Sequence, residues 1–450
     1  MIVSKHIKLP IGVIKMKPSF YNFFFPYEDN NRFIAYNSRS SALALIDKDK
    51  YKIFMDFCDS GQEIEDNKLI DDLKKGLFLI DDDVDELDIL RFNMLCSRFS
   101  TSNLGVTIAP TSDCNFRCIY CYEKDVLKPT YMSETTQEKI IELLKSKAKT
   151  ITKFSVSWYG GEPLLAFDII EKLSREFISI CNENNIQYSA GIITNGYLLS
   201  REKIAKLNDL KVNFYQVTID GLPETHNIRR PLIGGKHTFD TIMNNLKESM
   251  DILPRVALRI NIDRTNLSAG EHIIKILTEN NMDEKIFPYL GKTSNDNNCY
   301  DTPECLNTCE FSRKDLSYSL MMKNKIDIKN KYPSPRSNFC GADNMSAFVI
   351  GADGELYRCW SDIGLRDRSF GNINNNFGII NRALLQYMLF DPTVTEPCVN
   401  CNILPICMGG CPFRRLSNNN DNCTIYKYVL SNYIHYITSS IKNSEKACSR

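Results

Sequence analysis

Three cysteines stand close together in the stretch TSDCNFRCIYCYE, at positions Cys114, Cys118 and Cys121. Three thiolates on one loop can hold three irons of a four-iron cubane and leave the fourth iron open. An open metal position suits catalysis, because a reactant can bind there. A zinc knuckle and unligated thiols are the alternatives, although zinc wants a fourth ligand and no other His or Cys lies close by in the sequence. We call these three residues the loop set.

A second group of cysteines crowds the glycine-rich region toward the end of the chain. Seven thiols follow the pattern C-x13-G-x4-C, then C-x2-C-x5-C-x3-C, then C-x11-C. Short spacings of this kind favour metal ligation over disulfides in a reducing cytosol, with one or two zinc ribbons as the alternative. The residues of the pattern are Cys340, Gly354, Cys359, Cys398, Cys401, Cys407, Cys411 and Cys423.

The overall composition is that of a cytoplasmic globular protein. The 450 residues are 43% hydrophobic and 24% charged, which predicts two or three domains. Lys plus Arg and Asp plus Glu are 55 each, so the charge gives no reason to expect nucleic acid or a membrane as a partner. The first residues lack the apolar core and cleavage site of a signal peptide, and no run approaches the ~20 apolar residues of a spanning helix.

From residue 104 the pattern alternates six times between strand-like and helix-like segments. Such alternation predicts a parallel α/β sheet with helices outside it, which right-handed crossovers curl into a partial (β/α)6 barrel of the TIM type. Chemistry is then expected at the carboxyl ends of the strands. Strands are expected at Val106–Pro110, Phe154–Tyr159, Tyr188–Thr194, Phe214–Asp220, Val256–Asp263 and Lys285–Leu290, and helices at Glu134–Lys149, Leu164–Asn185, Arg201–Leu210, Phe239–Met250 and Ala269–Asn281.

Less regular segments flank the repeat. Residues 1–100 read as a small α+β module that contains a hairpin, Arg32–Asn37 with Ala42–Asp47, and short helices. After residue 291 Gly, Asn, Pro and Cys dominate, so this part is expected to need metals to hold it together before a last helix at Thr424–Ile441. The predicted division is 1–100, 101–290, a bridging region 291–339, and 340–450.

Polar motifs recur at the ends of successive predicted strands. The second ends in GGEP, the third in TNG and the fourth in IDGLPETHNIRR, while the fifth carries an Arg and an Asn. Each motif alone could be an ordinary turn or a surface pair. Their recurrence at neighbouring strand ends predicts one shared site. Its residues are Gly160, Gly161, Glu162, Thr194, Asn195, Asp220, His226, Arg229, Arg259 and Asn261.

The loop set resembles the C-x3-C-x-aromatic-C motif of the radical S-adenosylmethionine enzymes, with Tyr120 at the aromatic position. The resemblance implies that the amino and carboxylate groups of S-adenosylmethionine chelate the open iron, and that its reductive cleavage yields a 5′-deoxyadenosyl radical. It assigns the methionyl amino group to Glu162. It also implies cofactor contacts for Tyr120, Gly160, Gly161, Thr194, Asn195, Arg259 and Asn261.

The second cysteine group resembles the SPASM domain that follows the barrel in radical peptide maturases. The resemblance implies two auxiliary clusters, and therefore three 4Fe–4S clusters in all. Carried over residue by residue, the ligands are Cys340, Cys359 and Cys411 for the first auxiliary cluster (set A) and Cys398, Cys401, Cys407 and Cys423 for the second (set B). Set A lacks a fourth ligand: either Cys299, Cys305 or Cys309 loops in, or one iron stays open.

Together the resemblances imply oxidative modification of a ribosomally made peptide or protein. The leading hypothesis is a thioether cross-link from a cysteine sulfur to carbon. Residues 1–100 resemble the winged-helix domain that binds leader peptides, which favours a precursor peptide with a leader as partner, although a packing extension is the alternative. An electron donor such as flavodoxin or ferredoxin is also implied.

Two other functions stay open from sequence. One is formylglycine formation, as in anaerobic sulfatase maturases, and the other is a zinc-bearing peptide-binding scaffold without catalysis. The sequence assigns no catalytic acid or base, and Asp220, His226 and Arg229 are candidates for that role.

Overall fold

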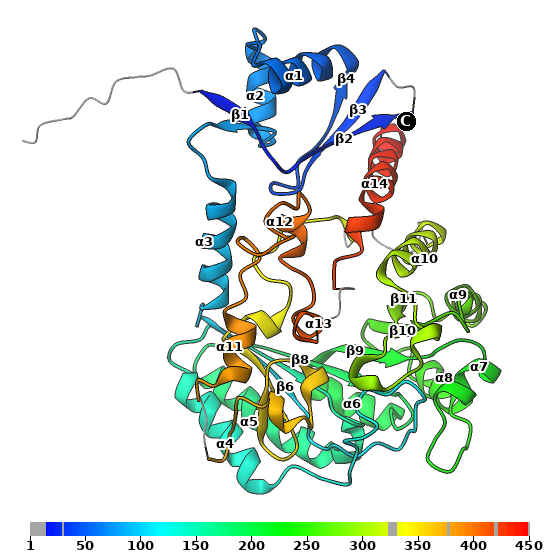
Figure 1. The fold of residues 1–450 in the computed structure, drawn as a ribbon. Helices are drawn as coiled ribbons and strands as arrows, with labels where there is room; N and C mark the ends of the chain where they lie inside the picture. Colours follow the sequence, from blue (N-terminus) through cyan, green and yellow to red (C-terminus); the bar gives the residue numbers. More distant parts are fainter. Residues whose placement is uncertain (1–14, 29–30, 323–330, 376–378, 418–421, 449–450) are drawn as a thin grey trace, which may run out of the picture.

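A computed structural model describes residues 15–28, 31–322, 331–375, 379–417 and 422–448. It arranges them as a large α/β unit with a smaller sheet module above it (Figure 1). Most of the segment considered above as a possible signal peptide lies outside the described residues. Within the described part of the chain, no helix is long and apolar enough to cross a membrane.

The centre of the molecule is a sheet in which six consecutive strands run parallel, in the order β11-β10-β9-β8-β7-β6. Each predicted strand is present, with ends within three residues of the expected ones. Alternate side chains such as Val106, Val156 and Leu258 are buried against the helices. The strands are β6 (Asn103–Ile108), β7 (Lys153–Trp158), β8 (Gln187–Thr194), β9 (Val212–Thr218), β10 (Val256–Ile262) and β11 (Ile286–Lys292).

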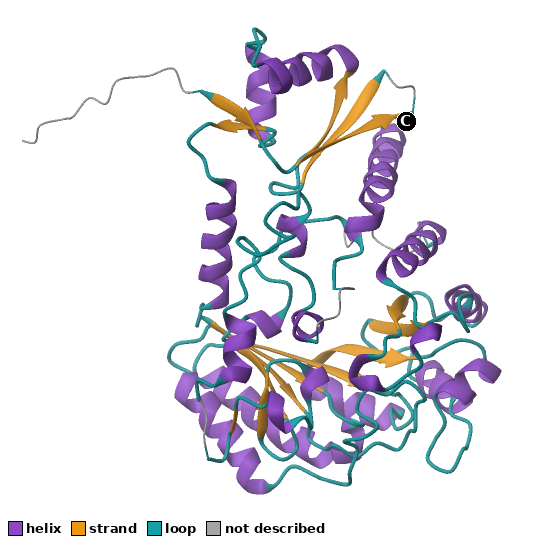
Figure 2. Ribbon diagram, viewed as in Figure 1, coloured by secondary structure: helices purple, strands orange, loops and turns teal. Residues whose placement is uncertain are grey.

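Helices cover the outer face of this sheet (Figures 1 and 2). The side chains of Ser133 and Ser200 cap two of them by accepting hydrogen bonds from Thr136 N and Lys203 N. The five predicted helices are present, and α7 is an additional one that the motif IDGLPETHNIRR had not revealed. The helices are α4 (Glu134–Lys147), α5 (Phe167–Glu183), α6 (Arg201–Asp209), α7 (Pro223–Arg229), α8 (Phe239–Glu248) and α9 (Ala269–Glu279).

The region after residue 291 extends the same sheet beyond β6. Strand β12 pairs parallel to β6, with Phe348 beside Val106, and β13 and β14 follow antiparallel. Sequence periodicity could not reveal strands of four, three and two residues. The elements here are α10 (Thr308–Met321), β12 (Ala347–Ile350), β13 (Glu355–Tyr357), β14 (Gly371–Asn372), α11 (Arg382–Met388), α12 (Leu404–Cys407), α13 (Pro412–Leu416) and α14 (Tyr426–Cys448).

The described residues between 15 and 100 form a three-stranded antiparallel sheet, β2-β3-β4, and a two-stranded sheet, β1-β5, with helices beside them. The predicted hairpin is present, with Ile34 opposite Leu45. Strand β2 was missed because its sequence, NFFFPY, has no apolar–polar alternation. The elements are β1 (Met16–Pro18), β2 (Asn22–Tyr27), β3 (Arg32–Asn37), β4 (Leu43–Asp47), α1 (Lys48–Ser60), α2 (Asn67–Lys75), β5 (Leu79–Asp81) and α3 (Glu86–Arg98).

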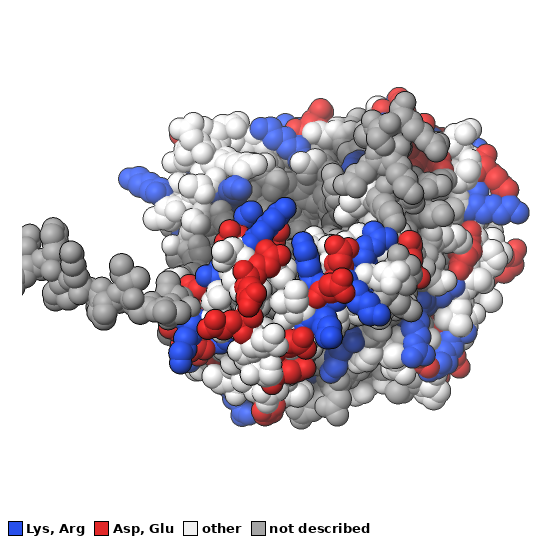
Figure 3. All heavy atoms as spheres, turned by 90° about the horizontal axis from the view of Figure 1, so that it is seen from above, with Lys and Arg blue, Asp and Glu red and all other residues white. Residues whose placement is uncertain are grey.

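This upper sheet shares a hydrophobic core with the cysteine-rich region. Tyr36 and Ile34 of β3 pack with Ile406 of α12 and Ile434 of α14. The Ser38 hydroxyl donates a hydrogen bond of 2.6 Å to the carbonyl of Asn402. The upper sheet is therefore fastened to the loops that carry set B. Over the face seen from above, acidic and basic side chains are interspersed (Figure 3), in keeping with the zero net charge.

We predict that Ile434→Ala lowers the free energy of unfolding by about 2–5 kcal/mol, because it leaves a cavity where α14 meets the upper sheet. Ile434 is 0% exposed. The matched control is Ile441→Ala on the same helix, where the side chain is 49% exposed and the change should stay within about 0.5 kcal/mol. Denaturant unfolding measures both. Equal effects of the two substitutions would mean that the shared core contributes little.

Candidate active site

The loop set lies directly after β6, in a loop folded back over the carboxyl end of the sheet. All three thiols are free, as are all sixteen cysteines whose side chains are described. Burial first, and then the neighbouring Glu162 carboxylate, raises the pKa of the Cys114 thiol to about 12. Burial and the nearby Cys118 also raise the pKa of Cys121. A raised pKa means that deprotonating these thiols costs free energy. Metal binding would supply that free energy, because cysteine binds metals as the thiolate.

Two glycines allow this loop to sit tightly against the next strand end. A Cβ atom on Gly160 would lie 2.5 Å from the carbonyl oxygen of Thr111, and one on Gly161 would lie 2.1 Å from that of Asp113. Gly160 also has a φ of 106°, which favours glycine. The amide of Glu162 then donates a hydrogen bond of 2.8 Å to the carbonyl of Asp113. The GGE motif therefore fixes the loop set to the end of β7.

The carboxylate of Glu162 is the meeting point of two strand ends. It is 1% exposed, and it accepts hydrogen bonds from the Thr194 hydroxyl at 2.6 Å and from the Asn195 amide at 2.8 Å. The Asn195 side chain in turn donates to Asn115 in the loop, at 2.8 Å. Burial raises the pKa of Glu162, and the hydrogen bonds from Thr194, Asn195 and Leu164 oppose that rise. The Glu162 carboxylate is thus buried beside Cys114 and fixed by hydrogen bonds. A carboxylate in this position is suited to accept hydrogen bonds from an ammonium group.

The hydroxyl of Tyr120 ties the loop to β9 and β10. It donates to the Asp220 carboxylate, and it accepts hydrogen bonds from Arg230 at 2.8 Å and from the Asn261 amide group at 3.0 Å. The guanidinium of Arg229 lies over the Tyr120 ring, 5.0 Å from its centroid. The aromatic position of the cysteine motif thus carries a hydrogen-bonding role that only tyrosine can fill.

The three residues considered for acid–base roles all lie in this buried network. Asp220 accepts from the amide of Asn261 at 3.0 Å as well as from Tyr120. Arg229 pairs with Asp263 at 2.7 Å. The His226 ring accepts from the Asp220 amide, and burial lowers its pKa well below the usual value. With 0–3% exposure these groups hold the strand ends together and present no free polar face to a substrate.

The remaining predicted cofactor contacts lie on β10. Asn261 is part of the Tyr120 network, and Arg259 donates a hydrogen bond of 2.7 Å to its side-chain oxygen. The structure therefore brings together Tyr120, Glu162, Thr194, Asn195 and Asn261 around the loop set, with Arg259 at the margin through Asn261.

Residues that the sequence did not single out also face the loop set. Arg230 is 7% exposed, and its positive charge acts on the Cys118 thiol. The Glu123 carboxyl is 4% exposed, with one oxygen that has no partner among the described residues, and burial raises its pKa to about 8. In the sequence, the only signal for Glu123 is its position two residues after Cys121.

The members of set A gather beside the extended sheet. Burial and then Asp362, Cys411 and Cys340 raise the pKa of Cys359, so the three thiols influence one another. Cys359 lies just after β13, whose partner β12 adjoins β6. Cys299, one of the three residues considered above as a fourth ligand, donates a hydrogen bond of 3.3 Å to the carbonyl of Tyr120 in the loop that carries the loop set.

The members of set B surround a cavity of about 520 Å³. The pKa of Cys398 is raised to about 11 by burial and by Cys407, Cys401 and Cys423. The four thiols of set B influence one another, as do the three thiols of set A. Among the described residues, no three His, Cys, Asp or Glu side chains come close enough to hold a single metal ion. Four thiols around one cavity match the number of ligands that a cubane takes, and set B provides them.

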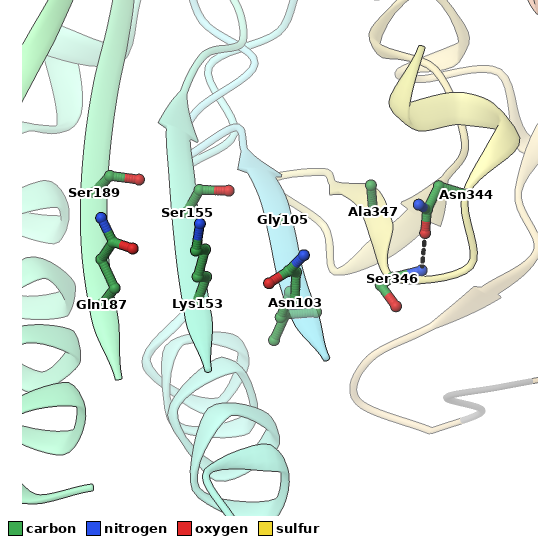
Figure 4. A pocket seen from close by; sticks show the side chains of 10 residues that line it. Asn103, Gly105, Lys153, Ser155, Gln187, Ser189, Asn344, Ser346 and Ala347 are labelled. Atoms are coloured by element: carbon green, nitrogen blue, oxygen red, sulfur yellow. Dashed lines mark hydrogen bonds between the residues drawn. The ribbon is translucent and has the colours of Figure 1, made fainter. Parts of the chain in front are cut away.

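A second hollow, of about 450 Å³, lies at the opposite end of the strands (Figure 4). Its lining comes from the starts of β6, β7 and β8, with Asn103, Ser155 and Ser189, and from Ser346, whose amide donates to Asn344 at 2.8 Å. It holds no cysteine and lies away from the strand ends that carry the motifs. This hollow is therefore separate from the candidate site at the carboxyl ends of the strands.

Comparisons with known proteins agree with this site. Residues 108–294 match the model of the radical SAM superfamily, a span that contains the loop set and every strand-end motif. The chain therefore contains a radical SAM domain, and the family implies a 4Fe–4S cluster and S-adenosylmethionine. A cysteine-type anaerobic sulfatase-maturating enzyme of Clostridium novyi is 25% identical over 387 residues, covering 75% of this chain and 96% of the relative. An uncharacterised protein of Methanocaldococcus jannaschii is 29% identical over 274 residues, covering 59% and 87%.

Solved structures share the fold. Native anSMEcpe with bound AdoMet and the Cp18Cys peptide aligns with a TM-score of 0.60 and 18% identity, covering 75% of this chain and 99% of that one. Streptococcus suis SuiB bound to the precursor peptide SuiA aligns with a TM-score of 0.54 and 14% identity, covering 90% and 97%. The chain thus contains a radical SAM domain, is similar in sequence to a sulfatase-maturating enzyme, and shares its fold with both structures.

We predict that Tyr120→Phe lowers the free energy of unfolding by about 1–3 kcal/mol, because Asp220 and Arg230 lose a buried partner. The same substitution should reduce the iron content after anaerobic reconstitution, since the loop loses its tie to β9 and β10. Tyr131→Phe is the control, because Tyr131 is 46% exposed and its hydroxyl donates only a long bond of 3.4 Å to Asp113. Unaltered stability and iron content in Tyr120→Phe would contradict the role of the hydroxyl.

We predict that Glu123 makes stability fall as the pH rises. Its folded pKa of about 8 lies above the ordinary value of 4.5, so the folded state keeps a proton that the unfolded state loses between these values. Stability should therefore fall by up to about 1.4 kcal/mol per pH unit in this window. Glu123→Gln should be more stable than the wild type at pH 8 and no more stable at pH 4. Melting curves across this range provide the measurement, and parallel pH profiles would contradict it.

Proposed function

We propose that this protein is a radical S-adenosylmethionine maturase that forms thioether cross-links, from a cysteine sulfur to carbon, in a ribosomally made precursor peptide. The observation that carries this proposal is the upper sheet module built into the cysteine-rich region. Residues 101–450 are 350 of 450 residues, about 78% of the chain. The alignment with SuiB covers 90% of this chain, so it must extend well into the first hundred residues. The alignment with anSMEcpe covers 75% of this chain, which is less than residues 101–450 alone.

The upper sheet has a surface suited to an extended peptide. Among the described strands, β4 pairs only with β3, which leaves its other edge open. Leu45 on this strand is 40% exposed, and Ala44 beside it is exposed as well. An open edge with apolar side chains can accept an added strand through main-chain hydrogen bonds. We therefore assign leader binding to this edge.

The residues of the site take the following roles in the proposal. When bound, the cluster and S-adenosylmethionine supply a 5′-deoxyadenosyl radical that removes a hydrogen atom from substrate carbon. The loop set holds the catalytic cluster, with Tyr120 and the two glycines fixing its position. Glu162 binds the methionyl ammonium group, oriented by Thr194 and Asn195. Sets A and B hold auxiliary clusters in a SPASM-type domain.

Formylglycine formation on a sulfatase is the second candidate. It is supported by the sequence similarity to the sulfatase-maturating enzyme of Clostridium novyi, which spans 96% of that relative. The two functions share the loop set and Glu162, and they differ in the substrate and in the fate of its thiol. A short peptide needs a leader-binding surface more than a folded sulfatase does, which favours the thioether product.

The products separate the two functions. We expect the reconstituted enzyme, given S-adenosylmethionine, a strong reductant and a small cysteine-containing precursor peptide, to remove two hydrogens from the peptide and protect one thiol from alkylation. A carbonyl that reacts with hydrazine would indicate formylglycine instead. Mass spectrometry detects both. Cys118→Ala should abolish 5′-deoxyadenosine release, and release at the wild-type rate would overturn the whole assignment.

The leader role has its own control. We expect Leu45→Asp to weaken processing of the full precursor at least tenfold, because the charge disfavours an added apolar strand at this edge. Processing of a peptide without its leader should be slow for both proteins. Leu385→Asp, at a residue of similar exposure on α11, should leave processing unchanged. Equal processing of leader-bearing peptide by wild type and Leu45→Asp would remove the basis for leader binding at β4.

A further inference from the structure

Three buried arginines converge on the backbone that carries set A. Arg98 and Arg358 are each 3% exposed, and the side chain of Arg415 is 7% exposed. Buried guanidinium groups are rare because removing their charge from water is costly. Of these three arginines, only Arg415 forms a salt bridge with a described residue. Its guanidinium lies 2.6 Å from the Asp343 carboxylate. The other two are held by backbone carbonyls.

Each cysteine of set A has one of these contacts close by in the chain. Arg358 directly precedes Cys359, and its guanidinium donates to the carbonyl of Ala342, two residues after Cys340, at 3.1 and 3.2 Å. Arg415 donates to the carbonyl of Gly410, directly before Cys411, at 3.2 Å. Arg358 and Arg415 also lie close enough to the Cys340 thiol for their charges to interact with it.

Arg98 adds a third charge from a distant part of the chain. Its guanidinium donates to the carbonyls of Met388 and Phe390, at 2.9 and 2.7 Å. It lies close enough to Asp343 and Arg415 for their charges to act on it. Two buried carboxylates, Asp343 and Asp362, face this region, and a third carboxylate, Asp391, also acts on Arg98 but is paired with Arg91 at 2.9 Å. With Arg91 and Asp391 set against each other, the three cations exceed the remaining two carboxylates by one before the thiols are counted.

The charged side chains near set B differ from those near set A. The ammonium group of Lys427 is 3.6 Å from the Cys423 sulfur and lies at an exposed position, where water and salt screen its charge. Arg415 also acts on Cys398, so it is shared by both sets, but Arg98 and Arg358 have no counterpart among the contacts described for set B. Set A also provides three thiolates, whereas set B provides four. A cluster with fewer negative ligands is more easily reduced.

We propose that Arg98, Arg358 and Arg415 raise the reduction potential of a cluster held by set A, and thereby make set A the site that receives the electron released during substrate oxidation. The inference rests on the proposed maturase function for its second half. The step balances as follows. A substrate C–H bond breaks and its hydrogen atom passes to the deoxyadenosyl radical. The thiol proton goes to solvent, the new C–S bond forms, and the one electron left over reduces the oxidised cluster of set A.

The first test measures the potential without substrate, so it does not depend on which product forms. Full-length enzyme is reconstituted anaerobically and titrated while electron paramagnetic resonance is recorded, with Cys340→Ser to identify the signal of set A. We expect Arg358→Met to shift this midpoint to more negative potential and Arg358→Lys, which keeps the charge, to retain most of the wild-type value. Lys427→Met is the control at set B, and it should leave set A unchanged.

The outcomes decide the proposal. An unchanged set A midpoint in Arg358→Met with full iron content would overturn it, as would equal shifts in the Met and Lys variants, which would indicate packing instead of charge. If Arg358→Met loses the iron of set A, Arg98→Met becomes the deciding variant, because Arg98 lies far from every cysteine of the set in the chain. That variant must then show the negative shift.

The second test addresses the electron. A single turnover with precursor peptide is freeze-quenched, and the reduced signal of set A should appear together with the cross-linked product. Appearance of the electron in set B first would overturn the assignment of set A as acceptor. A set A midpoint that shifts as expected, with no cross-linked product from any peptide, would instead count against the proposed function alone.

Discussion

The close approach of two backbone segments controls the geometry of the active site. The turn that carries Gly160 and Gly161 lies so near the carbonyls of Thr111 and Asp113 that no side chain fits between them. This contact brings the end of β7 against the loop that follows β6, and so places Glu162 beside Cys114. Any β-carbon here would push the carboxylate and the thiols apart, and the buried acceptor would no longer face the space that the loop set encloses.

The polar network around Tyr120 completes this arrangement from the other side. It joins the loop to β9 and β10 through Asp220, Arg230 and Asn261, so the loop is held by four of the six parallel strand ends. Buried polar networks are costly unless every member is paired, and pairing of this kind fixes one geometry. The same logic explains why Asp220, His226 and Arg229 serve as structural partners: their hydrogen-bonding capacity is spent on the strand ends.

The sequence predicted the parts of this structure that follow from local pattern. The six strands and their order came from the βα repeat, and the convergence of Glu162, Thr194 and Asn195 came from the rule that parallel strand ends share one edge of a sheet. The hydroxyl role of Tyr120 could not be predicted, because its partners lie 100, 110 and 141 residues away.

Other features were hidden for similar reasons. Strands β12 to β14 are too short to show a period, and the hydrogen bond from Ser38, just after β3, to Asn402, just before α12, joins residues 364 positions apart. Arg98 illustrates the same limit, because nothing around it in the sequence distinguishes it from a surface arginine at the end of an amphipathic helix. Its burial results only from the fold that brings residues 388–390 against α3.

The extension of the sheet connects the two ends of the proposed chemistry. Strand β6 leads into the loop set, and its parallel neighbour β12 leads through β13 to Cys359, so one rigid sheet sets the separation between the loop set and set A. Tyr159, at the end of β7, occupies the space between them: burial and then the charge of Cys121 raise its pKa, and Cys359 acts on it as well. Its ring stacks on Trp360, with centroids 5.5 Å apart. The loop set and set A therefore lie on either side of the Tyr159 ring, which stacks on Trp360, a side chain that is 44% exposed.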